Sequence, residues 1–100
     1  MPEFLYRLQL VRGDMLCTGP TASEQAVVAE HFAYLQDLTA QGVIILVGRT
    51  LTTDENTMGL AIFRAESEDA ARQIMNGDPA VKKGVMTATL YPFTIALHGK

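Results

Sequence analysis

The chain has 100 residues, enough for one domain with a buried core (residues 1–100) and too few for two. Its 8 basic and 11 acidic side chains give a formal charge of −3, so no nucleic-acid partner is expected, because phosphate backbones are bound by basic surfaces. Hydrophobic residues make up 48% of the sequence, but no apolar run approaches the ~20 residues that span a bilayer, so no membrane contact is expected.

The first predicted elements are a strand and a long helix. Aromatic and aliphatic side chains recur at every second position in residues 4–11, which is the period of a strand. Residues 12–20 contain the glycines and the proline typical of a loop. Thr21 and Glu24 have the spacing of a capping box, in which each side chain accepts a hydrogen bond from the other residue's backbone N–H. A helix is therefore predicted over about residues 22–41.

The predicted helix carries one apolar stripe and ends at Gly42, a residue suited to a left-handed stop. The stripe consists of Val28, Phe32, Leu35 and Leu38. At 3.6 residues per turn, His31 lies at the edge of this stripe and faces inward. A histidine in such a position is either a hydrogen-bonded core residue or a catalytic base, and position alone favours the core role.

A hairpin is predicted after the helix. Residues 43–47 are apolar without alternation, as in a central strand covered on both faces. The polar turn at residues 52–57 separates this strand from another at residues 59–64. Arg49 follows Gly48 near the end of the first strand, where its guanidinium is able to hold an anion, although a single surface arginine is more often only solvated.

The second helix begins after Ser67, which is a good N-cap, and is predicted to end near Gly77. Residues 85–90 form the next predicted strand. Pro92 is predicted to interrupt that strand, so that residues 93–97 lie on an edge or pair elsewhere.

Asp78 follows the second helix and precedes Pro79. A proline fixes its own φ, has no N–H to donate and disfavours helical angles in the residue before it. Asp78 is therefore predicted to have an extended backbone at a stiff corner, which would hold its carboxylate in a fixed direction. A helix stop followed by a turn explains the same two residues.

The order of elements predicts an α+β, ferredoxin-like βαββαβ fold, with a four-stranded antiparallel sheet and two helices on one face. The sequence has no glycine-rich phosphate loop, and its two histidines lack metal-ligand spacing, so neither a cofactor nor a metal is expected. Cys17 is the only cysteine, which excludes an internal disulfide and fits a reducing compartment. Residues 1–3 show no signal peptide, and a cytoplasmic protein is expected.

The chain resembles the YciI-related (YCII) domain family in an ordered set of residues. This set is Glu30-His31-Phe32-Ala33-Tyr34-Leu35, Leu38, Gly42, Gly48, Gly59, Ser67, Ala70-Ala71, and Asp78-Pro79 through Gly84-Val85 to Tyr91-Pro92-Phe93. The resemblance implies a dimeric α+β barrel and a site in which His31 and Asp78 form a catalytic dyad. Two positions depart from the family pattern: Ala80 replaces a usual aromatic residue, and Arg49 stands where proline is common. Both departures leave the substrate open.

A His31–Asp78 dyad would fix the imidazole tautomer and leave the second ring nitrogen free to move protons near neutral pH. We expect Tyr34, Gly48 and Arg49 to contact the substrate. Cofactor-independent elimination or isomerisation of a small ring compound fits these residues, and the resemblance suggests dehydrochlorinase-like lyase chemistry. The alternative is a non-enzymatic small-molecule-binding or stress-associated module, in which the pair only fastens the first helix to the Pro79 corner.

A homodimer is expected, with higher oligomers left open. Two helices cover only one face of a four-stranded sheet, and the other face would expose more apolar surface than monomers usually tolerate. A partner sheet packed at about 10 Å would cover it and give a two-fold barrel.

Overall fold

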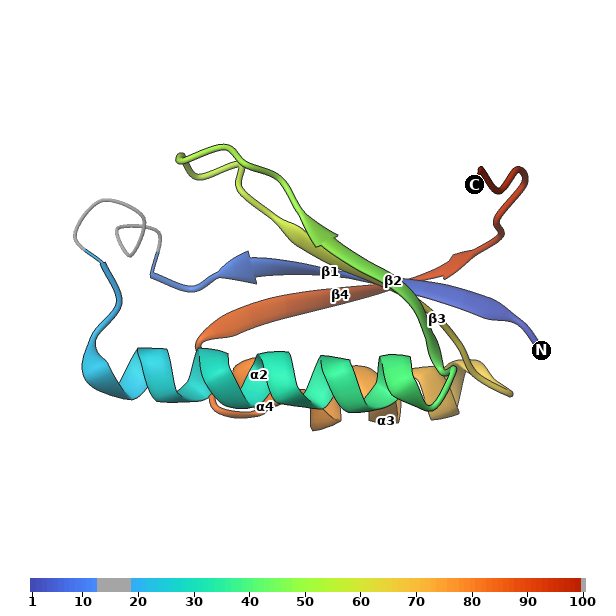
Figure 1. Cartoon of the computed structure of the whole chain (residues 1–100), viewed down its shortest axis with the longest axis horizontal. Coiled ribbons are helices and arrows are strands. Elements are labelled where there is room, and N and C mark those ends of the chain that lie inside the picture. The colour runs from blue at the N-terminus through green and yellow to red at the C-terminus, as the bar shows by residue number, and fades with distance from the viewer. Residues whose placement is uncertain (13–18, 100) are drawn as a thin grey trace.

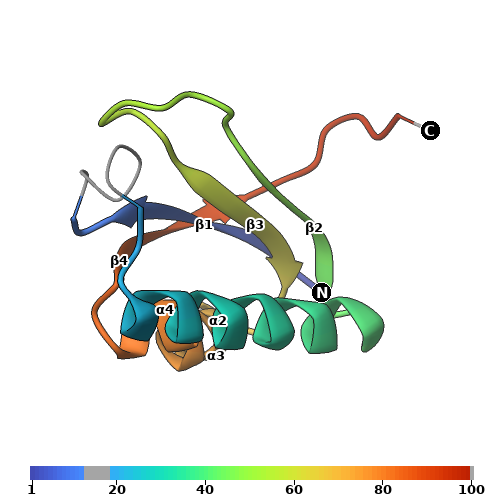
Figure 2. The ribbon, with the colours of Figure 1, turned by 60° about the vertical axis from the view of Figure 1, so that its left-hand side comes forward.

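The computed structural model describes residues 1–12 and 19–99. Its elements are β1 (Glu3–Leu10), α2 (Ala22–Ala40), β2 (Ile44–Arg49), β3 (Gly59–Arg64), α3 (Glu68–Gly77), α4 (Pro79–Lys82) and β4 (Met86–Phe93). The four strands form one antiparallel sheet in the order β2-β3-β1-β4. All three helices lie on the same face of this sheet (Figures 1 and 2). The predicted ferredoxin-like α+β fold is confirmed, and the short helix α4 was not predicted.

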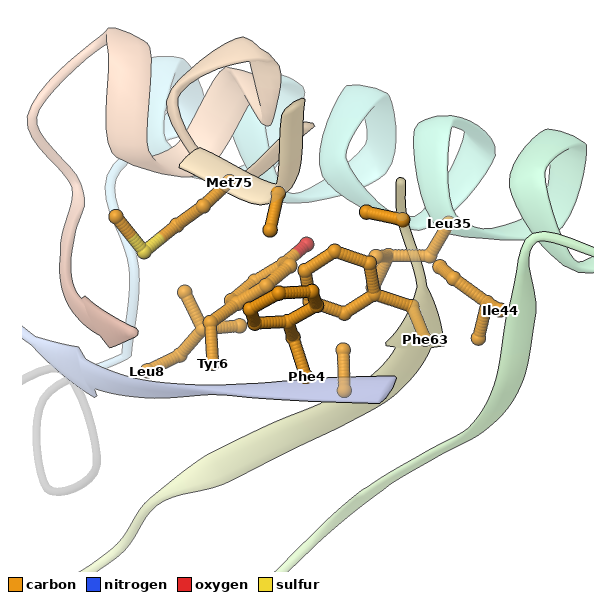
Figure 3. Packing of buried hydrophobic residues seen from close by; sticks show 10 residues of the cluster. Phe4, Tyr6, Leu8, Leu35, Ile44, Phe63 and Met75 are labelled. Carbon is orange, nitrogen blue, oxygen red and sulfur yellow. The ribbon is translucent and has the colours of Figure 1, made fainter. Parts of the chain in front are cut away.

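The core lies between the centre of the sheet and the helix layer (Figure 3). Strand alternation turns Phe4, Tyr6 and Leu8 of β1 toward the helices, and all three are buried. The Phe63 ring of β3 contacts two of them, with its centroid 6.1 Å from that of Phe4 and 5.6 Å from that of Tyr6. Leu35 of α2 closes the same cluster. The two central strands therefore hold most of the aromatic core.

The long helix α2 begins as predicted. The Glu24 N–H donates to Thr21 Oγ1, and the Thr21 N–H donates to Glu24 Oε1 at 2.7 Å, which completes the capping box. Its apolar stripe is only partly directed into the core, because Leu35 is buried whereas Phe32 remains 60% exposed. Phe32 is therefore not part of the buried core of the single chain. Its side chain instead borders a cavity between α2 and the sheet.

Strand β2 corrects a second prediction. It lies at one edge of the sheet and not at its centre, and a bulge interrupts its register with β3 between Ile44 and Leu46. Leu46 and Val47 are 43% and 42% exposed. An apolar run shows that a strand carries surface suited to burial, but strand order depends on topology, which the run does not encode.

Strand β4 continues through Pro92 to Phe93, so the predicted interruption is also wrong. Because β4 is the other edge of the sheet, a residue without an N–H is tolerated there. Residues 94–99 form no further strand. Cys17 and most of the predicted loop at residues 12–20 lie outside the described residues. In the described part of the chain, no helix is both long and apolar enough to cross a membrane.

Candidate active site

His31 and Asp78 meet in the helix layer. His31 is in the middle of α2, and Asp78 stands between α3 and α4, which bring its carboxylate beside the imidazole. His31 Nδ1 lies 2.6 Å from Asp78 Oδ1. Asp78 is completely buried, whereas the His31 side chain keeps 11% of its surface accessible. Two residues 47 positions apart in the sequence thus form one buried hydrogen-bonded pair.

The corner at Asp78 has the predicted geometry. Its φ of −63° and ψ of 123° are extended, and Pro79 begins α4 directly after it. The Ala80 N–H donates to Asp78 Oδ1 at 3.0 Å, so the carboxylate also caps α4. One oxygen atom of Asp78 therefore serves both the histidine and the helix start, which limits how the side chain can turn.

Tyr6 is a member of this cluster that the sequence analysis did not identify. Its hydroxyl donates to Asp78 Oδ2 at 2.9 Å, and its side chain is fully buried. Figure 3 shows its oxygen pointing from β1 toward the helices. Burial, followed by the nearby Asp78 charge, raises the pKa of Tyr6 well above its usual range, so the hydroxyl remains a donor. The only sequence signal was a tyrosine at an inward strand position, since a buried hydroxyl requires a partner.

A cavity of about 400 Å³ lies between α2 and the sheet, and His31 forms part of its wall. Most of the remaining wall is apolar, contributed by Leu8, Leu10, Val28, Phe32, Leu35 and Met86. Within the described residues, His31 Nε2 has no hydrogen-bond partner, whereas Nδ1 is held by Asp78. Nε2 is therefore the ring atom left to interact with a molecule in the cavity.

The start of the β2–β3 hairpin supplies the polar part of the cavity wall. Gly48, Arg49 and Thr57 all border it, so the structure brings Gly48 and Arg49 to the same cavity as His31. The Arg49 side chain is exposed at the end of the edge strand β2. A small, mostly apolar cavity bordered by a histidine, an arginine and a threonine suits a compact ring compound that bears acidic groups.

The sequence matches the YCII-related domain family over residues 8–94. The chain belongs to this family. The matched segment contains both His31 and Asp78 but begins after Tyr6. A comparison with curated protein sequences gave no match for this YCII-related domain protein.

Solved structures similar to this YCII-related domain protein include enzymes. A 5-chloro-2-hydroxyhydroquinone dehydrochlorinase (TftG) from Burkholderia phenoliruptrix, in complex with 2,5-dihydroxybenzoquinone, is 24% identical, with a TM-score of 0.65 over 91% of this chain and 93% of that one. The cofactor-independent oxygenase SnoaB from Streptomyces nogalater is 14% identical, with a TM-score of 0.53 over 98% and 97%. An uncharacterised protein from Thermotoga maritima is 11% identical, with a TM-score of 0.56 over 92% and 95%. At these identities the likeness establishes the fold.

Tyr34 of the YCII-related domain lies outside the cavity wall, unlike Gly48 and Arg49. Its hydroxyl donates to the Ile74 carbonyl of α3 at 2.7 Å. A Cβ atom at Gly77 would lie 2.9 Å from the Tyr34 hydroxyl oxygen, so a side chain there would have to displace this hydroxyl from its place between α2 and α3. Burial and the Asp78 charge raise the pKa of Tyr34. These contacts connect two helices, and we assign Tyr34 no substrate contact.

No group of three or more histidine, cysteine or acidic side chains is arranged to hold a metal ion within residues 1–12 and 19–99. The second histidine, His98, lies in the segment after β4. Nothing in the described residues therefore adds a ligand set to the His31–Asp78 pair.

Proposed function

We propose that this protein is a cofactor-independent enzyme that uses His31 and Asp78 to transfer protons on a small ring compound with acidic or phenolic groups. The observation that carries this proposal is the position of the His31–Asp78 pair at the wall of a cavity, with Nε2 unoccupied. A pair that only fastened α2 to the Pro79 corner would need no cavity beside it. The cavity therefore speaks against a pair that only fastens the helix, and turnover is what distinguishes an enzyme from a binding module without catalysis.

The proposed chemistry follows from the hydrogen bonds of the imidazole. An Nδ1–H that donates to Asp78 leaves a lone pair on Nε2, which removes a proton from the bound molecule. The Asp78 carboxylate stabilises the resulting imidazolium. Returning the proton to another atom completes an isomerisation. In a dehydrochlorination, chloride leaves with its bonding electron pair, so the net loss is HCl and no electron acceptor is required.

Arg49 and Gly48 are the proposed substrate contacts. The guanidinium of Arg49 would attract a phenolate or carboxylate oxygen at the cavity mouth, and the lack of a side chain at Gly48 leaves room for the ring. The dehydrochlorinase with a similar fold supports chlorinated hydroxyquinols as the first substrates to test, and lactones extend the test to isomerisation.

We also propose that the protein works as a homodimer through the sheet face opposite the helices. In register across the four strands, this face presents a row of apolar residues: Leu46, Ile62, Leu5 and Tyr91. Leu46 and Tyr91 are 43% and 41% exposed in the single chain. Arg7 lies on the same face, and among the described residues its buried Nε has no hydrogen-bond partner. A second copy would cover the apolar row.

Residence in the cytoplasm stays a prediction from the sequence.

The test of the enzymatic proposal is turnover by purified protein. Chloride release from chlorinated hydroxyquinols and isomerisation of lactones are measured for the wild type, His31→Gln, Asp78→Asn and the double variant. We expect each single substitution to remove most of the activity, and the double variant to lose little more, because the two residues act as one unit. Saturable binding without turnover of any of these compounds would favour the binding module. Turnover that survives His31→Gln would overturn the proposed role of the imidazole.

A further inference from the structure

We propose that Tyr6 is the positioning residue of this site, so that the working unit is a Tyr6–Asp78–His31 relay and not a dyad. The inference rests on the proposed function for its catalytic meaning, but the relay itself can be tested without any substrate. Tyr6 lies outside the segment matched to the family and does not border the cavity. Its influence on a substrate would therefore be exerted through Asp78.

The acceptor atoms of Asp78 are divided among three donors. Oδ1 receives the Ala80 N–H at 3.0 Å and lies 2.6 Å from His31 Nδ1, whereas Oδ2 receives the Tyr6 hydroxyl at 2.9 Å. Without the Tyr6 bond, Oδ2 would be a completely buried carboxylate oxygen without a donor in the described part of the chain. Tyr6 therefore decides which oxygen is presented to His31.

Tyr6 is also the member of the relay that comes from the sheet. The other two donors to Asp78 belong to α2 and α4, which are themselves parts of the helix layer. Tyr6 is in the middle of β1, paired with Ala61 and Leu90 on its two sides, and its ring packs edge-on against Phe63 at 70°. The hydroxyl thus connects Asp78 to the buried aromatic core of the sheet.

This arrangement matters when the imidazole changes its charge. As Nε2 gains and loses a proton, the attraction between His31 and the Asp78 carboxylate rises and falls, and the carboxylate must keep its orientation throughout. Burial and the Asp78 charge keep Tyr6 protonated, so its bond to Oδ2 persists through the cycle. A tyrosine that merely fills the core would need a partner for its hydroxyl, but that partner could be any carbonyl, as it is for Tyr34.

Tyr6→Phe and Tyr34→Phe form a matched pair for the test. Each removes one hydrogen-bonded hydroxyl and keeps the ring, but only the Tyr6 hydroxyl donates to Asp78. The readout is the proton resonance of His31 Nδ1–H and its exchange with water. We expect Tyr6→Phe to move this resonance and to raise its exchange rate by about tenfold or more, as expected for the loss of one charge-assisted hydrogen bond. Tyr34→Phe should leave both quantities at the wild-type values.

The Asp78→Asn variant distinguishes an effect of Tyr6 through Asp78 from a general loss of core packing. In that background the asparagine NH2 group faces the Tyr6 hydroxyl and no charge-assisted bond joins them, so adding Tyr6→Phe should change the His31 signal much less than it does in the wild type. Equal effects of Tyr6→Phe and Tyr34→Phe, or a full Tyr6→Phe effect in the Asn background, would overturn the relay. If the NMR effects appear but no compound is turned over, the relay stands and the proposed enzymatic function fails. Should Tyr6→Phe not fold, the ring 13C resonance beside the Tyr6 hydroxyl is compared between the wild type and Asp78→Asn, and a resonance that Asp78→Asn leaves unchanged would overturn the relay.

Discussion

Replacing Asp78 by asparagine should lower the stability of the protein by an amount that its hydrogen bonds define. The asparagine carbonyl oxygen can still accept from His31 and Ala80, but its NH2 group then faces the Tyr6 hydroxyl. That hydroxyl must turn round to accept a hydrogen bond, which leaves its own proton buried without an acceptor. One such unsatisfied buried group costs about 1–3 kcal/mol.

The assay is urea unfolding followed by circular dichroism, with the midpoint and the m value fitted separately. We expect a lower midpoint at an unchanged m value, and a melting temperature reduced by about 4–20 °C. Asp78→Ala removes the acceptor for all three donors and should cost more, about 3–5 kcal/mol. Asp54→Asn is the matched control, because this exposed residue keeps its oxygen for the Asn56 N–H; its effect should stay within about 0.5 kcal/mol. Asp78→Asn at or above wild-type stability would refute the reasoning, since the desolvation penalty of the buried carboxylate would then exceed the stabilisation from its hydrogen bonds.

Three other predictions follow from the structure. Pro79→Ala should leave the melting temperature nearly unchanged but weaken ligand binding or turnover, because the Asp78 backbone would no longer be restricted to extended angles. An unfolded variant would show that Pro79 is needed for the fold itself. Light scattering at micromolar concentration should give twice the mass of the chain, and Arg7→Glu should reduce it; a stable monomer would contradict the sheet interface. Hydrogen bonds from Arg12 lower the pKa of Glu24 to about 2, so its stabilising effect should be complete above its ordinary pKa of 4.5 and be lost as the pH falls toward 2. Glu24→Gln should remove that part of the acid sensitivity, and an unchanged acid-unfolding curve would contradict it.

Local signals in the sequence were sufficient for most of the fold. The capping box at Thr21, the N-cap at Ser67 and the extended angles before Pro79 are confirmed, since each depends on neighbouring residues only. Errors arose where the answer depended on distant partners. The apolar strand β2 lies at the sheet edge, and β4 continues through Pro92 because its free edge needs no N–H there.

The candidate site shows the same division. His31 could be placed at an inward helix edge and Asp78 on a stiff corner, but the bond between them required the family resemblance or the structure. Strand periodicity could not distinguish Tyr6 from an ordinary core residue, because the partner of its hydroxyl is a residue far away in the sequence that only the fold brings near. Tyr34 lies nearly one helical turn after His31 on α2, yet its hydroxyl donates to the Ile74 carbonyl of α3 and does not border the cavity.

The central claim is that His31 presents an unprotonated Nε2 to the cavity while Nδ1–H donates to Asp78. The most direct measurement is the 15N spectrum of protein labelled at histidine, because protonated and unprotonated ring nitrogens are clearly separated, and His98 provides a reference outside the site. For the neutral His31 ring we predict a proton on Nδ1 and none on Nε2, with the Nε2 signal moving when one of the proposed chlorinated hydroxyquinol substrates is added. A neutral His31 that carries its proton on Nε2 would contradict the account, since the nitrogen facing the cavity would then be unable to act as a base.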